Sequence, residues 1–528
     1  MPVDAKLNMR GYQHLKDISD NKKDFIFFLV LLFFGILIFA PSLQIPFISD
    51  EVAFIKRNTV SNLAQLLALF DKKDYDGFYY RPLGNLVSGI LTLFAGDNAF
   101  LYRLFNVILH VVNTFIFYRF AKIISEKLGN SSFAYVAPLI FLVFPGNDYA
   151  LLWHTALFDR LLLGVYFLGL LSFLKNYRIT IASVCFFILA IFSKESAFSF
   201  PFVIFIANYF LNEKRGSLLN SLKKSGVYFL FLLAFLLVRM VVFNNNVFTA
   251  QDAHSSAGLF TIIKNYFFFG GFLLFPFSPR MIQQLLLSHR ELIFILVGFG
   301  SIATFVLVYK NKSDKLFWFL LLFVILTILP ASRLFMRWYL YLPSTGFVLL
   351  LCYLIFTTFK ERKQILYASL VIIFSIYSSS LLLKEVTWLN VSKKSVVALK
   401  ELQKEFDSTE FTSITFLTIP AKVGDVPIYQ LQFETLVQYY LKKQVSVTVL
   451  SKSFFSTWDE TIAVKAENNG TIVLQHNKDN YFLLFDNKKN INFDLKTGKQ
   501  LSFPIIWETG TLYVFFSEGK FQNINGKL

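Results

Sequence analysis

The sequence predicts a polytopic α-helical membrane protein with a small C-terminal domain of α+β or β-rich type outside the cytoplasm. Of its 528 residues, 55% are hydrophobic and 18% aromatic, and the mean hydropathy is +0.54. Only 16% are charged, against roughly 25% in a typical soluble domain. Apolar runs of membrane-spanning length recur up to about residue 384 and then stop.

The formal net charge of +17 does not indicate a nucleic-acid partner. Most Lys and Arg residues lie in short connections between apolar runs and in the C-terminal tail. The positive-inside rule explains the clusters in the connections without any polyanion. Cys185 and Cys352 both lie inside apolar segments, so neither predicts a disulfide framework or a metal site.

The first apolar run, Phe25 to Ala40, follows Lys22-Lys23 and is expected to be a retained anchor behind a cytoplasmic segment, residues 1–24. A long outer loop, residues 45–100, comes next. Within it, Ser61 to Phe70 combines a helix cap with an apolar stripe and predicts a helix on the membrane surface. Further spans are predicted at about 103–124, 133–146, 156–174, 178–193, 197–212, 226–243, 291–309, 315–330, 338–359 and 364–384.

Basic clusters fall on every second connection between these spans. They are Lys122 and Lys127; Lys175 and Arg178; Lys214, Arg215, Lys223 and Lys224; Lys310, Lys312 and Lys315; and Lys360, Arg362 and Lys363. All can be cytoplasmic together only if residues 262–277, with Gly270-Gly271 and Pro276, are interfacial or re-entrant. This topology has about eleven spans, with a transmembrane domain at 25–384 and the C-terminal domain at 385–528 outside.

The C-terminal domain shows short β-rich segments separated by Asn, Gly, Lys and Asp turns. They are Ser413 to Ile419, Val445 to Leu450, Thr471 to Gln475, Tyr481 to Phe485 and Leu512 to Phe516.

The predicted topology collects a group of polar residues on the outer face. They are Asp50, Glu51, Tyr79-Tyr80-Arg81-Pro82, Asn147-Asp148, Trp153-His154, Asp159-Arg160, Ser193-Lys194-Glu195, Asp252, His254, Arg280, His289, Arg290, Arg333 and Arg337. Carboxylates at the end of a span, such as Asp50 and Glu51, favour a functional role. Cations on this face run against the positive-inside bias. A bound phosphate would explain them, because guanidinium groups bind phosphate oxygens bidentately.

Each of these residues also has a structural interpretation. Asp50 and Glu51 could simply face water, and Lys194 and Glu195 could form an ion pair between two helix ends. Arg337, beside Trp338 and Tyr339, could be an interfacial anchor. His154 could hydrogen-bond a neighbouring loop, and Asp159 and Arg160 could pair with each other or with other helices. The sequence contains no Gly-rich phosphate loop next to a strand, no HExxH, no paired CxxC and no Gly-x-Ser-x-Gly motif.

The order of motifs resembles the membrane part of the GT-C glycosyltransferases, especially the protein O-mannosyltransferase-like group with the TMTC-type region. The resemblance covers about residues 25–384 and depends on motifs that occur in the same order. These are the acidic pair Asp50-Glu51, Tyr80-Arg81-Pro82-Leu83, Phe105 to Asn113, Trp153-His154 with Asp159-Arg160-Leu161-Leu162, Ser193-Lys194-Glu195-Ser196-Ala197 with Pro201, and Arg337 to Ser344.

The resemblance implies transfer of a sugar from a polyprenyl-phosphate donor to an acceptor on the outer face, by inverting displacement. Asp50 matches the family's catalytic base, with Glu51 as its partner. Lys194, Arg337 and Arg81, in that order, are expected to bind the donor phosphate. Tyr80, His154, Asp159, Arg160 and Glu195 are expected to bind substrate. Some relatives use a divalent cation and others do not, so that cofactor stays open and no metal ligand is assigned.

The sequence departs from the TMTC-type pattern in two respects. It has Ser49-Asp50-Glu51 where many relatives have two aspartates, and a β-rich tail instead of helical repeats. The acceptor therefore stays open between a glycan, a lipid and a protein. The membrane is expected to be a bacterial inner membrane, with the active site and C-terminal domain outside the cytoplasm.

Two other function classes fit a polytopic chain. A transporter or flippase of lipid-linked saccharides would also need cations for phosphate, but it usually shows two related halves and charges near the middle of the membrane. If the protein were a non-enzymatic scaffold, the order of the outer motifs would be a coincidence. We therefore rank the glycosyltransferase first, the flippase second and the scaffold last.

Overall fold

The computed structural model describes residues 3–71, 79–213, 216–242, 258–276, 308–407, 411–467, 471–476, 481–484, 492–493, 498–504 and 507–525. Several residues of the sequence-based interpretation lie outside these ranges. They are Lys214, Arg215, Asp252, His254, Arg280, His289, Arg290 and most of the predicted span 291–309.

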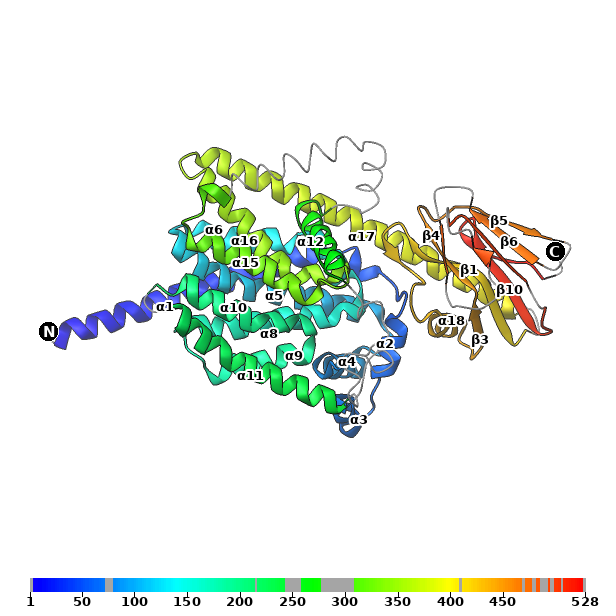
Figure 1. Ribbon diagram of the computed structural model, residues 1–528, viewed down its shortest axis with the longest axis horizontal. Coiled ribbons are helices and arrows are strands. Elements are labelled where there is room, and N and C mark those ends of the chain that lie inside the picture. The colour runs from blue at the N-terminus through cyan, green and yellow to red at the C-terminus, as the bar shows by residue number, and fades with distance from the viewer. Residues whose placement is uncertain are drawn as a thin grey trace.

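The N-terminal three quarters of the described chain is a bundle of helices (Figure 1). The α-helices are α1 (Val3–Ile38), α2 (Glu51–Asn58), α3 (Leu63–Ala68), α4 (Pro82–Ala95), α5 (Ala99–Leu128), α6 (Ser132–Leu142), α7 (Asp148–Leu152), α8 (Leu157–Leu174), α9 (Ile181–Ser193), α10 (Phe200–Ile206), α11 (Leu218–Val242), α12 (Leu259–Leu274), α15 (Lys315–Ile328), α16 (Tyr341–Thr358) and α17 (Lys363–Asp407). Short 3-10 turns connect them: η1 (Ser42–Gln44), η2 (Leu69–Asp71), η3 (Pro145–Asn147), η4 (His154–Ala156), η5 (Glu195–Ser199), η7 (Leu329–Ala331) and η8 (Arg337–Leu340). Residues Ala207–Leu211 form a π-helix, η6.

Local sequence signals set several helix ends. Asn98 caps α5 by accepting a hydrogen bond from the backbone of Phe100, and Gly129 ends α5 in the left-handed region at φ +68°. Thr180 and Ser183 form a reciprocal capping box at the start of α9. The predicted cap before the surface helix is confirmed, because the Asn62 side chain accepts from the backbone of Gln65 at the start of α3.

The protein is an integral membrane protein. Within the described residues, five helices are long and apolar enough to cross a membrane, or six if the bent pair Ser132–Leu142 and Pro145–Leu152 is one span. The five are Ala99–Leu128, His154–Leu174, Leu218–Val241, Arg337–Thr358 and Lys363–Asp407. Large apolar side chains on the outside of the bundle, such as Leu230 on α11 and Leu383 on α17, are 68% and 69% exposed. This is the composition of a lipid-facing surface.

The basic connections lie together at one end of the bundle. There the Lys127 ammonium pairs with Glu213 at 3.0 Å, joining the end of α5 to the connection before α11. Lys224 Nζ of α11 donates to the carbonyl oxygen of Tyr177, in the turn between α8 and α9, at 2.6 Å. We call the end formed by the residues 127–132, 175–180, 211–213 and 216–218 the basic end. It lies opposite the β-sheet domain (Figure 1).

Helix α12 covers most of residues 262–277, the segment expected not to cross. It is continuous through Gly270-Gly271. Its Asn265 side chain donates to the carbonyl oxygen of Ser332 at 2.8 Å, and Phe269 packs edge-on against Phe335. Its path relative to the membrane, and with it the count of about eleven spans, stays a prediction.

Helix α17 crosses the predicted domain boundary at 384–385 without a break. It runs for 45 residues, from the basic end to the C-terminal domain (Figure 1). Its last turns contribute Leu399, Leu402 and Phe406 to the core of that domain. The sequence indicated the end of the apolar run, but a helix can continue beyond the membrane when its next turns bury an apolar face elsewhere.

The C-terminal domain is α+β, with two sheets and the helix α18 (Phe433–Leu441). The larger, mixed sheet has the strand order β11-β10-β1-β4-β7, with β2 and β3 also paired to β1. The smaller, antiparallel sheet has the order β5-β6-β9-β8. The strands are β1 (Ser413–Val423), β2 (Val426–Pro427), β3 (Ser446–Val449), β4 (Ser451–Phe455), β5 (Ile462–Ala466), β6 (Thr471–His476), β7 (Tyr481–Leu484), β8 (Asn492–Phe493), β9 (Gln500–Pro504), β10 (Thr511–Ser517) and β11 (Lys520–Asn523). All five predicted β-rich segments are strands.

A single apolar core joins this domain to the helical bundle. It contains Phe47 and Trp153 from the bundle together with Trp388 of α17 and Phe433 of α18. Because the loop before α2 lies in this core, the β-sheet domain packs directly on the segment that carries Asp50.

Candidate functional site

The loop that carries Asp50 has a strained backbone. Ser49, immediately before it, has φ +52°, a left-handed conformation that a residue with a side chain rarely adopts. Such conformations cluster at functional sites, where the surroundings hold them in place. Here the Ser49 N–H donates to the carbonyl oxygen of Ile428 at 2.7 Å, and the Ser49 hydroxyl accepts from the Leu431 N–H at 3.3 Å.

Asp50 is the residue before α2 and is only 2% exposed. Its Oδ1 accepts from the Trp153 indole N–H at 3.0 Å and from the Thr155 hydroxyl at 3.4 Å. The first outer loop and the α7–α8 connection, which lie 103 positions apart, therefore meet at this carboxylate. The interpretation that Asp50 faces water does not describe this structure.

Glu51 is held by an arginine that sequence reasoning missed. Arg103 of α5 donates from Nη1 to Oε1 at 2.6 Å and from Nη2 to Oε2 at 2.7 Å. Both side chains are at most 1% exposed. Glu51 also accepts from the N–H groups of Ile48 at 3.0 Å and His154 at 2.6 Å. Glu51 therefore fixes the loop around Asp50. Arg103 lies near the start of a span on the predicted outer side, where the positive-inside rule makes an arginine unusual. This position is the feature of the sequence from which a role for Arg103 could have been inferred.

Two other predicted substrate residues support the same loop. His154 is fully buried, and its Nδ1 lies 3.1 Å from the amide oxygen of Asn106. The Arg160 guanidinium donates to that oxygen at 2.8 Å and to the His154 carbonyl at 3.1 Å. It also donates to the carbonyl of Ala150. These contacts agree with the structural interpretation, in which His154 hydrogen-bonds neighbouring segments and Arg160 binds other helices.

The motif at Phe105 to Asn113 meets the motif at Arg337 to Ser344 inside the bundle. His110 Nδ1 lies 2.7 Å from the Tyr341 hydroxyl, and Asn113 donates to that hydroxyl at 3.3 Å. Asn113 also donates to the carbonyl of Arg160 at 2.8 Å. Segments from α5, α8 and α16 are thereby fixed relative to one another below the Asp50 loop.

Lys194 and Asp159 form a buried ion pair. Lys194 Nζ lies 2.5 Å from Asp159 Oδ2, and the two side chains are 3% and 5% exposed. The same ammonium lies 4.1 Å from the ring centroid of Tyr339, a cation–π contact. Lys194 therefore pairs with Asp159 of α8, not with its neighbour Glu195.

Arg81 pairs with Glu195 beside this group. Arg81 donates to Glu195 Oε2 from Nη2 at 2.6 Å and from Nε at 3.1 Å, and Arg239 Nη1 lies 3.5 Å from Oε1. Burial is the largest single influence and opposes the charge of Arg81, but the Glu195 carboxylate together with Tyr339 and Tyr79 outweighs it, so the pKa of Arg81 is raised above its ordinary value. Arg81 also interacts electrostatically with Asp159 and Lys194. We call Arg81, Asp159, Lys194, Glu195 and Tyr339 the paired-charge cluster.

Tyr80, the remaining predicted substrate residue, is 6% exposed. Its ring packs edge-on against Phe70 and Phe192, with centroids 6.3 and 6.2 Å away. The structure thus places Tyr80 in an aromatic contact next to Arg81.

Arg337 belongs to a second charged group, at the junction with the β-sheet domain. Its Nη2 lies 2.5 Å from Asp148 Oδ2, and its Nη1 lies 3.5 Å from Asp425 Oδ2 in the turn between β1 and β2. Lys384 of α17 lies 3.5 Å from the same Asp148 oxygen. We call Asp148, Arg337, Lys384 and Asp425 the junction cluster.

The short turn η8 connects the two groups to the Asp50 loop. Arg337 belongs to the junction cluster, while Tyr339 contacts Lys194. Between them, the Trp338 ring packs edge-on against Trp153, whose indole N–H holds Asp50. The predicted catalytic and phosphate-binding residues therefore occupy one continuous region. Each predicted phosphate-binding cation is already paired with a carboxylate. Among the residues described, no group of three or more His, Cys, Asp or Glu side chains could hold a metal ion.

These features define an integral membrane protein with a buried carboxylate loop and ion pairs at the end of the bundle next to its α+β domain. No protein-family model matches the chain, and no curated protein matches it. Two solved structures of ArnT from Cupriavidus metallidurans are similar to it. The one bound to undecaprenyl phosphate has 11% identity and a TM-score of 0.41, and the one in the apo state has 10% identity and a TM-score of 0.37. Both matches cover 79% of this chain and 85% of the other.

Proposed function

We propose that the protein is a GT-C-like membrane glycosyltransferase that moves a sugar from a polyprenyl-phosphate donor to an acceptor hydroxyl. The observation that carries the proposal is the placement of Asp50. It is a buried carboxylate on a strained loop, and its Oδ1 accepts hydrogen bonds from Trp153 and Thr155. Both carboxylate oxygens of Glu51 are bound by Arg103, so we assign Glu51 to holding the loop and Asp50, which matches the acidic position of the GT-C resemblance, to accepting the proton.

The proposed reaction is a single displacement. The acceptor oxygen attacks the anomeric carbon while its proton passes to the Asp50 carboxylate. The bond between the anomeric carbon and the phosphate oxygen breaks, and the electron pair leaves with polyprenyl phosphate. One displacement inverts the anomeric configuration. The sugar acceptor can be a glycan, a lipid or a protein.

The leaving phosphate requires positive charge where its own negative charge develops. For contact with this phosphate, our order of preference is Lys194, then Arg337, then Arg81. Lys194 and Arg81 belong to the paired-charge cluster, and Arg337 belongs to the junction cluster. All three are bound to carboxylates, so we propose that they are shared between carboxylate and phosphate oxygens when donor is present.

The positive-inside rule supports a cytoplasmic position for the basic end. The site and the β-sheet domain then lie outside the cytoplasm, and we propose a bacterial inner membrane as the location. A donor with a polyprenyl chain stays in the bilayer, so its phosphate must be bound where helices meet the interface. The buried ion pairs at the helix ends next to the β-sheet domain support this position for the donor site.

A panel of polyprenyl-phosphate sugars, supplied to the purified full chain with mixed acceptors, tests the proposal. We expect release of polyprenyl phosphate from at least one donor, with the sugar recovered on an acceptor. A flippase would instead move an intact lipid-linked saccharide across a vesicle membrane without releasing its phosphate. Movement without release would overturn the transferase in favour of the flippase.

A further inference from the structure

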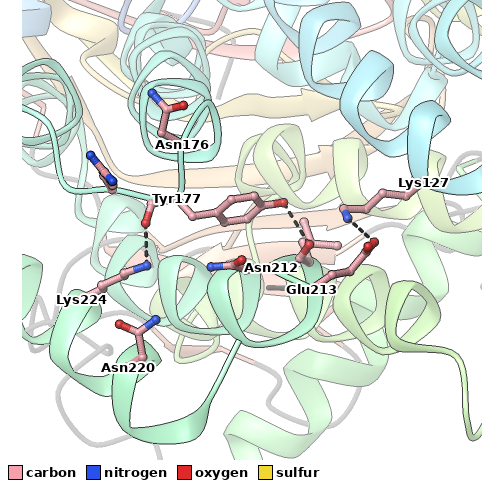
Figure 2. Close-up of a pocket in the computed structure, with 9 residues that line it drawn as sticks. Lys127, Asn176, Tyr177, Asn212, Glu213, Asn220 and Lys224 are labelled. Atoms are coloured by element: carbon pink, nitrogen blue, oxygen red, sulfur yellow. Dashed lines mark hydrogen bonds and ion pairs between the residues drawn. The ribbon is translucent and has the colours of Figure 1, made fainter. Parts of the chain in front are cut away.

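A polar cavity lies at the basic end of the bundle, away from the Asp50 loop. Its volume is about 510 Å³, within the range of known small-molecule pockets. The walls come from the end of α5, the turn between α8 and α9, the end of η6 and the first turns of α11 (Figure 2). The glycosyltransferase proposal makes no use of this cavity.

The charges that line the cavity favour an anion. Lys127, Arg178 and Lys224 line it, against one carboxylate, Glu213, which leaves a formal excess of two positive charges. Glu213 pairs with Lys127, but its side chain is 80% exposed, so water screens that pair. Among the described residues Arg178 makes no ion pair.

The Lys224 ammonium is held in position. Its Nζ donates to the Tyr177 carbonyl at 2.6 Å and to the side-chain oxygen of Asn208 at 2.8 Å (Figure 2 shows the first of these). Asn208 in turn donates to the Ser221 hydroxyl at 2.8 Å. An ammonium fixed in this way loses little conformational entropy when it binds an anion.

The backbone around the cavity is fixed as well. Tyr177 has φ +50°, and its hydroxyl donates to the carbonyl of Leu211 at 3.1 Å. Leu211 ends the π-helix η6, an element that is often found at functional sites. A Cβ atom at Gly216 would lie 2.5 Å from the carbonyl oxygen of Asn212, so this turn requires glycine.

The surroundings of the cavity indicate which anion would bind. Large apolar residues within three positions of its lining residues are exposed, among them Ile181, Leu219 and Leu222, at 87%, 64% and 52%. A ligand with a phosphate group and acyl chains could place the phosphate among the cations and the chains on this apolar rim. Basic pockets between membrane helices at the cytoplasmic face bind anionic lipid headgroups.

We propose that this cavity binds the phosphate of an anionic phospholipid headgroup, as a second phosphate site that is separate from the one proposed for the donor. Lipid binding here would fasten α5, the α8–α9 turn and α11 together. The proposal does not depend on the glycosyltransferase assignment, because the two sites lie at opposite ends of the bundle.

Equilibrium binding to the full chain in neutral detergent tests this, with short-chain phosphatidylglycerol as the probe. Short-chain phosphatidylcholine and inorganic phosphate serve as comparison ligands. The test variant is Arg178→Gln with Lys224→Gln. The matched control is Lys175→Gln with Lys223→Gln, which removes two exposed charges from the same two connections without touching the lining.

We expect phosphatidylglycerol to bind at least about tenfold more weakly to the test variant than to the control, as loss of charge-assisted contacts predicts. Arg178→Gln alone should give a smaller loss in the same direction, which keeps the test valid if the Lys224 variant folds poorly. Equal binding to test and control variants would overturn the site. Binding of inorganic phosphate as tight as that of phosphatidylglycerol would overturn the lipid assignment.

Discussion

The N–H of Ser49 donates a hydrogen bond of 2.7 Å to the carbonyl oxygen of Ile428. This bond joins the residue before Asp50 to the β-sheet domain, and the Tyr440 hydroxyl adds a second link by donating to the Phe47 carbonyl at 2.8 Å. The domain is therefore part of the structure that sets the position of Asp50, and changes in it should reach the site through the backbone.

Asp50→Asn should abolish most transfer while leaving the fold intact. The amide keeps the size of the side chain but cannot accept a proton, and loss of a general base typically lowers the rate by about 100-fold or more. Sugar transfer by purified protein and a thermal unfolding curve are the two measurements. Asp97→Asn is the matched control, because Asp97 is exposed in the same outer loop. Near-normal transfer by Asp50→Asn would remove Asp50 as the base.

Glu51→Gln should destabilise the protein more than Asp50→Asn does. It leaves Arg103 buried opposite a neutral amide, and loss of one partner from a buried pair costs about 3 to 5 kcal/mol. Turnover per folded molecule should fall less than in Asp50→Asn, because Glu51 positions the loop. Thermal unfolding in detergent, followed by transfer assays on the folded fraction, separates the two effects. An unchanged unfolding midpoint would show that the Glu51–Arg103 pair does not hold the loop.

Lys194→Ala and Arg337→Ala should each weaken donor binding by about one to two orders of magnitude, the value of a charge-assisted phosphate contact. Arg333→Ala, which removes an exposed arginine from the same region, is the control. Binding of a polyprenyl-phosphate sugar is the measurement.

A double variant distinguishes donor binding from a purely structural role of the Lys194–Asp159 pair. Lys194→Ala with Asp159→Ala removes both buried charges, so it should recover much of the stability lost in Lys194→Ala. Donor binding should stay weak in the double variant. If it returned together with stability, Lys194 would be a structural anchor.

The C-terminal domain should lose stability as the pH falls below about 6.5, the ordinary pKa of histidine. Burial lowers the pKa of His476 below that value, so at acid pH the unfolded chain binds a proton that the folded domain excludes. The free energy of unfolding then falls by up to 1.4 kcal/mol per pH unit until the lowered pKa is reached. The His476 ring packs against Phe455 and Phe482, so His476→Phe should fit and remove this contribution. Equal pH dependence of both proteins would contradict the assignment.

Residues beyond α17 should lie outside the cytoplasm. A reporter that is active only outside should work when it is joined after Asp407, and a cytoplasm-only reporter should work when it is joined after Lys360, in the connection between α16 and α17. The reverse pattern would invert the proposed orientation and place the Asp50 loop on the cytoplasmic side.

Much of the fold could be predicted because membrane helices and strands leave direct patterns in the sequence. The long apolar runs appear as α5, α8, α11 and α16, and the predicted β-rich segments are strands. The end of α17 could not be predicted, since its last turns bury an apolar face against a domain more distant in sequence. Periodicity reports that a face is apolar but does not identify what covers it.

The sequence named candidate site residues but did not indicate how they pair. Asp50, Lys194 and Arg337 do lie in one region, yet their partners Trp153, Asp159 and Asp148 come from other helices. The sequence suggested a pairing of Lys194 with Glu195, and both residues instead pair across the bundle. These partners lie 35 to 189 residues apart in the sequence, so their contacts depend on helix packing, which a single sequence does not encode locally.

The link between the Asp50 loop and the β-sheet domain also sets the order in which the protein can be completed during synthesis. Residues 47 and 49 contact residues 440 and 431, which are made 393 and 382 positions later. At roughly 5 to 20 residues per second, the ribosome needs about 20 to 80 s to cover that distance. Throughout this time Phe47 and Ser49 lack their contacts with the β-sheet domain. In a chain truncated before the β-sheet domain, the acidic loop would be held only by contacts within the bundle, such as those of Glu51 with Arg103 and of Asp50 with Trp153.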